Sequence, residues 1–187
     1  PTERTHIGYG FLQVTEYGLH LGVDINFGSS AWADLGREVR ACAAGNIVRS
    51  LKVSDKIPSL GECIIIEHQL PDGQKIYSRY GHLLERWIAE GQEVDVGQGI
   101  GKLGMSGTGS PHLHFEIFNE EFYLNFIKRY GAGHYPLWSD RNKVLNHFAD
   151  PDLFIQEHQV VAKKEESGVA EDRAIIAYKD FESDVVE

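Results

Sequence analysis

Five side chains of the kinds that bind metals or move protons occur in strand-like stretches of this 187-residue chain. His20 and Asp24 are four residues apart, His112 and His114 are separated by one residue, and His82 lies between the two groups. If the segment around the second pair is a β-strand, its period of two places both imidazoles on one face. Imidazole nitrogens and carboxylate oxygens are common zinc ligands, and a catalytic zinc site keeps three protein ligands and one open position.

Other kinds of site are less compatible with these patterns. No pair of cysteines has ligand spacing, which argues against a closed structural zinc site, and no His-Glu-x-x-His motif is present, which excludes the helical zincin arrangement. The glycine-rich loop at residues 102–109 is a candidate phosphate cradle, but no Gly-Lys-Ser/Thr follows it and no helix is expected after it. A His-x-His pair by itself also arises from one core and one surface histidine, so the remaining motifs must decide.

Three motifs in a fixed order carry a resemblance to a known family. His20-x-x-x-Asp24, the sequence YGHL at residues 80–83 and HLHFE at residues 112–116 resemble the lysostaphin-type (LytM-like) zinc metallopeptidases. These enzymes cleave peptides of bacterial cell walls. The resemblance extends from about residue 20 to residue 117, and the ordered combination is much more specific than any one motif.

The resemblance implies a role for each of the five side chains. His20, Asp24 and His114 would hold one Zn²⁺ per chain, while His82 and His112 would face the catalytic water and the scissile carbonyl. Zinc lowers the pKa of water to about 7, and histidine is suited to proton transfer at that pH. We expect His112 to be the general base and His82 to stabilise the oxyanion, and the opposite assignment stays open.

The implied function is a zinc-dependent endopeptidase that hydrolyses peptide crosslinks of peptidoglycan with a metal-activated water. The implied location is the periplasm, the cell envelope or the extracellular space, where that substrate is found. Two alternatives stay open. A catalytically idle relative would bind or activate another cell-wall hydrolase, although such relatives usually lack a ligand. A sugar-transport phosphocarrier has a similar β-fold and paired histidines, but Asp24 and the acidic surface make it a poorer match.

The chain departs from the family pattern in two loops and at its C-terminal side. The segment at residues 24–39 is several residues longer than the usual link, and the glycine loop before Pro111 is one residue shorter. Because these loops rim the groove, the departures bear on substrate preference rather than on the chemistry. The stretch at residues 118–150 exceeds the short family C-terminus and is expected to cap the barrel or narrow the cleft.

The elements that must position these side chains are predicted to be β-strands. Residues 62–68 and 74–83 are rich in β-branched and aromatic types and flank a Pro-Asp-Gly turn. Residues 38–51 predict a hairpin, and residues 84–88 predict a short helical turn. We expect a mainly β fold in which residues 1–118 form a compact antiparallel core, a two-sheet sandwich or barrel-like peptidase domain.

Apolar residues follow a helical spacing after this core. Two helices are predicted at residues 120–130 and 140–148, within a short helical extension at residues 119–160 that packs on the core. Pro151 is expected to end the second helix, and residues 153–155 are expected to dock on the core.

The rest of the C-terminal sequence is acidic. From Lys163 on it holds eight acidic and four basic residues, so residues 161–187 are expected to form an acidic, mobile tail. Residues 174–178 are a candidate edge strand.

Composition limits the partners of the chain. The net charge is −10, from 18 basic and 28 acidic side chains, which argues against a nucleic-acid partner because the phosphate backbone requires a basic surface. No apolar run approaches the roughly 18 residues of a membrane span. The chain starts at Pro1 with no signal-peptide pattern, which is compatible with a regulatory or anchoring segment ahead of it.

The remaining reactive side chains are expected to be structural. Cys42 and Cys63 fall in apolar stretches and are predicted to be free thiols rather than a disulfide. His68 is predicted to lie at a strand end. The other histidines are predicted to be surface or structural residues: His6, His134, His147 and His158.

Overall fold

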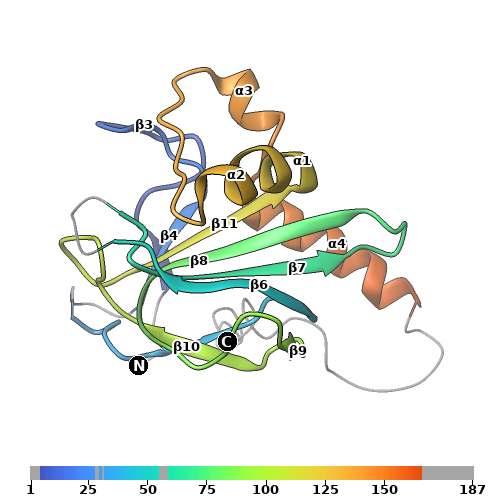
Figure 1. Ribbon diagram of the computed structural model, residues 1–187, viewed down its shortest axis with the longest axis horizontal. Helices are drawn as coiled ribbons and strands as arrows, with labels where there is room; N and C mark the ends of the chain where they lie inside the picture. The colour runs from blue at the N-terminus through green and yellow to red at the C-terminus, as the bar shows by residue number, and fades with distance from the viewer. Residues whose placement is uncertain (1–4, 28–29, 31, 55–58, 166–187) are drawn as a thin grey trace, which may run out of the picture.

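A ten-stranded antiparallel sheet lies at the centre of the computed structural model, which describes residues 5–27, 30, 32–54 and 59–165 (Figure 1). Seven strands lie side by side in the order β1 (Thr5–Ile7), β4 (Val23–Phe27), β11 (Leu113–Asn119), β8 (Lys75–Arg86), β7 (Glu62–Gln69), β6 (Gly45–Lys52) and β9 (Glu93–Val94). Three more strands attach to this row: β5 (Glu38–Arg40), β10 (Gly99–Leu103) and β12 (Phe148–Ala149). A separate two-stranded ribbon joins β2 (Val14–Thr15) to β3 (Gly18–Leu19).

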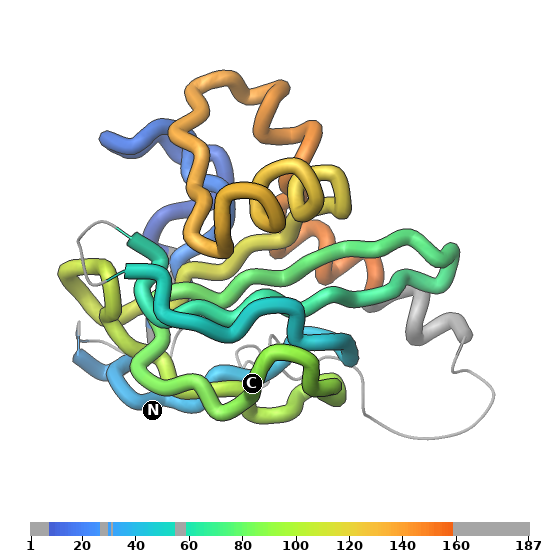
Figure 2. Tube along the Cα trace, viewed as in Figure 1, coloured from blue at the N-terminus to red at the C-terminus, as the bar shows by residue number. Residues whose placement is uncertain are grey.

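The long strand β8 makes the sheet fold over itself. Most of β8 pairs with β11 and β7, whereas its end from Leu83 to Arg86 pairs with β10, which in turn pairs with β5. The tube in Figure 2 shows β10 and its neighbours as a second layer below the main row of strands. The predicted mainly β, antiparallel architecture is therefore confirmed, and its two layers belong to one continuous sheet.

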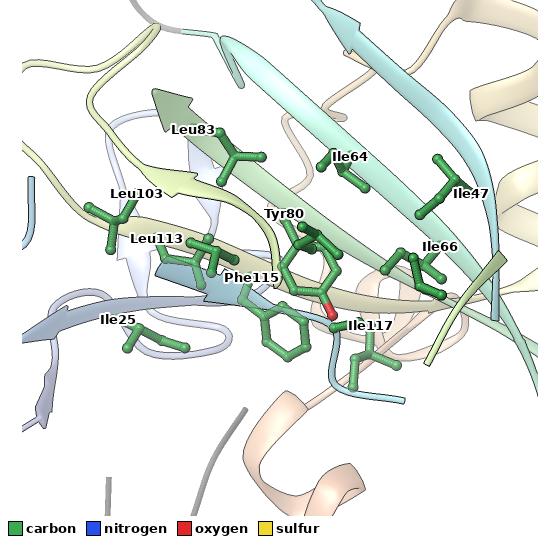
Figure 3. Close-up of a cluster of buried hydrophobic side chains, with 14 of the residues drawn as sticks. Ile25, Ile47, Ile64, Ile66, Tyr80, Leu83, Leu103, Leu113, Phe115 and Ile117 are labelled. Atoms are coloured by element: carbon green, nitrogen blue, oxygen red, sulfur yellow. The ribbon is translucent and has the colours of Figure 1, made fainter. Parts of the chain in front are cut away.

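The central strands are buried on both faces, so their side chains divide between two hydrophobic clusters. The first cluster lies between the main row and the β5–β10 layer, where Ile64, Tyr80 and Phe115 point into a common core (Figure 3). The second cluster covers the opposite face and includes Ile65 and Phe118. Because side chains alternate along a strand, His114 and Glu116 share the face of Phe118 rather than that of Phe115.

Helices cover both of these faces. A continuous helical segment made of α1 (Glu120–Phe122), η1 (Tyr123–Ile127) and α2 (Lys128–Tyr130), followed by α3 (Arg141–Leu145), packs on the second cluster. The last helix, α4 (Pro151–Glu165), packs Phe154 and Ile155 against the first cluster on the other side (Figure 1). Of residues 153–155, which were predicted to dock on the core, Phe154 and Ile155 do so, whereas Leu153 is exposed. In the described part of the chain, no helix is both long and apolar enough to cross a membrane.

Three local predictions were wrong. Residues 38–51 do not form a hairpin, because β5 pairs with β10 and β6 pairs with β7 and β9. Residues 84–88 are not a helical turn, because β8 continues to Arg86 to join the second layer. Pro151 does not end a helix but begins α4, where proline is favourable because the first helical turn needs no N–H donor there.

The predicted division at residues 118 and 160 stays a prediction. The expected tail beyond Glu165 and the candidate edge strand at residues 174–178 lie outside the described residues.

Candidate metal centre

Three neighbouring strands bring the five predicted side chains together. Strand β11 lies between β4 and β8, so that His114 is directly opposite Asp24 on one side and opposite Gly81 on the other. His82 follows Gly81 in β8, and His20 precedes β4 by three residues. The sheet order therefore converts three segments that are distant in sequence into one cluster.

The three predicted ligands form the tightest part of this cluster. His20 Nε2 lies 3.1 Å from His114 Nδ1 and 3.2 Å from Asp24 Oδ1, and His114 Nδ1 lies 2.9 Å from Asp24 Oδ1. All three residues are buried: His20 exposes 5% of its surface, His114 exposes 4% and Asp24 exposes 6%. Among the described residues, the donor atoms of these three side chains lie close enough together to hold one metal ion.

The partners of the two rings show why a cation fits between these atoms. His20 Nδ1 lies 3.2 Å from the carbonyl oxygen of Gly10, and His114 Nε2 lies 2.7 Å from Glu116 Oε1. Because carbonyl and carboxylate oxygens only accept, these ring nitrogens keep their protons, so the neutral rings have their lone pairs on His20 Nε2 and His114 Nδ1. Together with Asp24 Oδ1, three electron-pair donors then face one another. Tetrahedral zinc with bonds of about 2.0–2.1 Å requires donors about 3.3 Å apart, close to the observed spacing.

The electrostatics of the donors also favour a positive charge between them. Burial opposes ionisation of Asp24, but hydrogen bonds to His114 and His20 outweigh it and hold the pKa of this carboxyl far below its usual range. Burial likewise lowers the pKa of His114, but Glu116 and Asp24 outweigh it and raise the pKa to about 9. A proton or a metal ion satisfies the same demand of the two carboxylates for a cation.

His82 and His112 lie beside the three donors with their rings held by backbone carbonyls. His82 Nδ1 donates to the carbonyl of Ser106 at 2.9 Å, and His112 Nδ1 donates to the carbonyl of Ser110 at 3.0 Å. The ring centroids of the two histidines are 4.6 Å apart, and His112 Nε2 lies 3.6 Å from Asp24 Oδ1. Each ring therefore presents Nε2 as its free acceptor.

The neutral form of both rings is favoured by their surroundings. Burial first, and then the neighbouring His112 and His114, lower the pKa of His82 to about 3. Burial also lowers the pKa of His112. His82 adopts a backbone φ of 62°, in the left-handed region that non-glycine residues rarely occupy. Such strain is typical of functional positions, where the surrounding contacts hold the residue in place.

Two residues that sequence reasoning did not assign to the site lie next to it, together with Glu116 of the HLHFE motif. Arg79 donates through Nε to Glu116 Oε2 at 2.6 Å, and the ring of Tyr135 packs edge-on against His114 with centroids 5.7 Å apart. The Tyr135 oxygen accepts a hydrogen bond from the backbone N–H of Leu21 at 3.2 Å. Glu116 could have been found as part of its motif, but no local signal distinguishes Arg79 or Tyr135 from ordinary packing residues.

The other histidines whose side chains are described lie away from this cluster. His134 and His147 are among the aromatic rings of the helical extension, and His158 bonds its own helix through the Phe154 carbonyl. The side chain of His6 lies outside the described residues.

A second group of polar side chains, in which His68 and Ser78 are buried and Cys42 is partly buried, lies on the opposite face of the sheet. His68, near the end of β7 as predicted, is 3.9 Å from Cys42 Sγ and 2.7 Å from Ser78 Oγ. These three residues line a cavity of about 330 Å³ between the sheet and α4. Both Cys42 and Cys63 are free thiols, as predicted.

Comparison with known sequences identifies relatives over the segment that carries the cluster. The model of peptidase family M23 matches residues 18–126, more than half of the chain. The lipoprotein NlpD/LppB homolog of Pseudomonas aeruginosa is 36% identical over 93 residues, which cover 50% of this chain and 29% of that protein. The murein hydrolase activator NlpD of Escherichia coli is 35% identical over 82 residues, 44% of this chain and 20% of the relative.

A relative named as an enzyme matches a shorter segment. The peptidoglycan DD-endopeptidase ShyA of Vibrio cholerae is 37% identical over 73 residues, which cover 38% of this chain and 16% of that protein. The chain therefore spans less than a third of the length of these curated relatives. Among solved structures, the catalytic domain of lysostaphin from Staphylococcus simulans has the same fold, with a TM-score of 0.54 at 24% identity, over 81% of this chain and 92% of that domain.

Proposed function

The chain belongs to peptidase family M23, and on this premise we propose that it is a zinc-dependent endopeptidase that hydrolyses peptide crosslinks of bacterial peptidoglycan. The observation that carries the proposal is the convergence of His20, Asp24 and His114, whose donor atoms lie within 3.2 Å of one another. We assign these three side chains as the ligands of one Zn²⁺. Membership of this family sets aside the phosphocarrier alternative.

Zinc in this position would supply Lewis acidity, which lowers the pKa of a water molecule and polarises a peptide carbonyl. The protein must then move protons, and His82 and His112 are the groups next to the donors that do so. Because each ring already gives its Nδ1 proton to a carbonyl, each offers Nε2 as a base. We assign His112 as the base, since it is less buried than His82 and lies 3.6 Å from Asp24.

As the base, His112 takes one proton from the water at Nε2, becomes an imidazolium and can give that proton to the leaving amine. His82 gives its Nδ1 proton to Ser106, so it can stabilise an oxyanion only by taking a separate proton at Nε2, which its lowered pKa of about 3 allows only as negative charge develops beside the ring. The two histidines are 4.6 Å apart between centroids, so one can serve as base while the other faces the carbonyl oxygen. An exchange of their roles stays compatible with this geometry.

The names of the relatives support a location in the cell envelope, because they describe a lipoprotein homolog, a murein hydrolase activator and a peptidoglycan endopeptidase. Peptidoglycan peptides are the partner that this location provides.

Hydrolysis of purified peptidoglycan tests the proposal. The wild-type protein should release new amino groups from crosslinked peptides, and a chelator or His114→Ala should abolish the release. His158→Ala serves as the matched control, because this histidine bonds only within α4 in the described contacts, and it should leave activity unchanged. Activity that survives both chelation and His114→Ala would refute the proposal.

A catalytically idle activator of another cell-wall hydrolase is the second candidate, because one of the relatives is named as a murein hydrolase activator. Metal analysis separates the two. A protein that is purified without zinc and cannot be loaded with zinc would favour the activator, whereas one bound ion per chain and its loss in Asp24→Ala would favour the enzyme.

A further inference from the structure

A buried ion pair contacts the candidate metal centre at His114, through the ring nitrogen that does not face His20 and Asp24. Arg79 and Glu116 are both completely inaccessible to solvent. Arg79 donates through Nε to Glu116 Oε2 at 2.6 Å and contacts the same oxygen through Nη2. The other oxygen, Oε1, lies 2.7 Å from His114 Nε2. The carboxylate therefore connects a guanidinium on β8 to a predicted ligand on β11.

This connection determines which nitrogen of His114 is free for the metal. Because Glu116 Oε1 can only accept, it keeps a proton on His114 Nε2, so that in the neutral ring, the form that binds a metal, the lone pair lies on Nδ1. Nδ1 is the atom that faces His20 and Asp24, at 3.1 and 2.9 Å. A carboxylate behind a ligating histidine orients the ring and increases its basicity.

The helical extension holds the outer end of the same chain of contacts. Arg79 Nη1 donates to the carbonyl oxygens of Ala132 and His134, both at 3.1 Å. These carbonyls belong to the connection between α2 and α3. Tyr135 in the same connection contacts the His114 ring and accepts from the N–H of Leu21, the residue after His20.

A buried ion pair seldom stabilises a fold, because desolvation of both charges offsets their attraction. Arg79 and Glu116 are thus poorly explained as packing alone. With its guanidinium fixed by two carbonyls, Arg79 allows one orientation of the Glu116 carboxylate, and that carboxylate allows one tautomer and one orientation of His114.

We propose that Arg79 and Glu116 are positioning residues of the metal centre, and that residues 132–135 of the helical extension complete the centre by fixing Arg79. This inference rests on the assignment of His114 as a zinc ligand. It gives the extension a role in metal binding in addition to covering the sheet.

The test compares zinc affinity in two double variants. Arg79→Met with Glu116→Gln removes both charges but keeps a side-chain oxygen that can accept from His114. The control, Arg86→Met with Glu62→Gln, removes the ion pair between the same two kinds of residue on β8 and β7, joined at 2.6 Å. Arg86 also bonds Ser50, so this pair supports the sheet rather than a metal ligand. Competition with a chromophoric chelator gives the dissociation constant, and circular dichroism confirms folding.

The first double variant should bind zinc about 10–100-fold more weakly than wild type, because loss of the group that hydrogen-bonds a metal ligand typically lowers metal affinity by that factor. The control should change affinity less than about threefold. Arg79→Lys provides a milder variant, since an ammonium keeps the charge but lacks the planar fork that reaches Glu116 and two carbonyls at once. It should give an intermediate affinity and an altered visible spectrum of the Co²⁺-loaded protein, which a purely structural role would not produce.

A folded Arg79→Met/Glu116→Gln protein with wild-type zinc affinity would overturn the inference, as would a folded Arg79→Lys protein with both wild-type affinity and an unchanged cobalt spectrum. Wild-type protein that binds zinc but does not cleave peptidoglycan would refute the proposed hydrolase and leave this inference standing. Wild-type protein that binds no zinc would refute both.

Discussion

Replacement of Gly22 by alanine should disrupt the fold and the metal centre together. Gly22 lies between His20 and Asp24, where a Cβ atom would be 2.1 Å from the carbonyl oxygen of Phe115 on β11. A distance of at least 3.0 Å is needed, so the segment must move from β11 by about 0.9 Å. A typical strand hydrogen bond of about 2.9 Å would then lengthen to about 3.8 Å, beyond the range of an effective bond.

The expected cost follows from these distances. Loss of about two hydrogen bonds at about 1 kcal/mol each, with overpacking of about 1–3 kcal/mol, lowers the free energy of unfolding by about 3–5 kcal/mol. For a chain of this length, the melting temperature should fall by about 6–20 °C. Displacement of His20 and Asp24 by nearly 1 Å relative to His114 also exceeds the tolerance of about 0.2 Å for metal ligands. The zinc dissociation constant should therefore rise at least tenfold.

Urea denaturation of the metal-free protein and chelator competition measure these two effects separately. Gly10→Ala is the matched control in the same N-terminal region, because nothing lies within 4 Å of the added Cβ. It should be neutral or stabilise the protein by about 0.4–1 kcal/mol, through the lower entropy of the unfolded chain. If Gly22→Ala and Gly10→Ala unfold at the same urea concentration and bind zinc equally, the account of the close approach between β4 and β11 is wrong.

Three further predictions concern other parts of the molecule. Arg79→Met leaves a buried carboxylate without its partner and should lower the free energy of unfolding by about 3–5 kcal/mol, whereas Arg86→Met, whose ion pair is partly exposed, should cost less than about 1 kcal/mol by urea denaturation. His112→Ala should retain one zinc ion per chain by metal analysis but lose about 10²–10⁴-fold in peptidoglycan hydrolysis; loss of the metal would contradict its assignment as a base. Alkylation by iodoacetamide at pH 8, followed by mass spectrometry, should modify Cys42, beside His68 and a cavity, and leave Cys63 unmodified, because burial raises the pKa of Cys63 to about 12.

The side chains that converge on the metal centre could be predicted because they are chemically distinctive and their spacing is local. His112 and His114 share a face for any β-strand, and His20 and Asp24 add a further imidazole and a carboxylate, which are zinc-ligand types. The choice of His20, Asp24 and His114 as the ligands came from the family resemblance and not from the spacing. Arg79 could not be predicted in the same way. Its partner Glu116 is 37 residues away, and its other partners are backbone carbonyls, which carry no sequence signal.

In the fold, likewise, the strands themselves could be predicted from their own residues, whereas their pairing partners could not. β-Branched runs predicted β7 and most of β8, since the propensity of a strand is a property of its own residues. The partner of a strand depends on the rest of the sheet, and this is why β5 and β6 were wrongly expected to form a hairpin. The role of Pro151 also depended on context, because proline is unfavourable inside a helix but favourable at its first position.

The geometry of the donors favours the enzyme over an idle activator. An activator requires a surface for its partner, and nothing in such a surface demands three buried lone pairs. With neither a proton nor a metal ion among them, His20 Nε2, His114 Nδ1 and Asp24 Oδ1 would repel one another at 2.9–3.2 Å, and burial removes the water that would screen them. A proton on His114 or a bound metal ion removes this cost, and the proposed hydrolysis gives a role to the two additional histidines whose free Nε2 atoms lie beside the donors. The surroundings of His114 therefore favour a cation at this point, a proton in the metal-free protein, where the pKa of His114 is raised to about 9, and a metal ion in the enzyme that we propose.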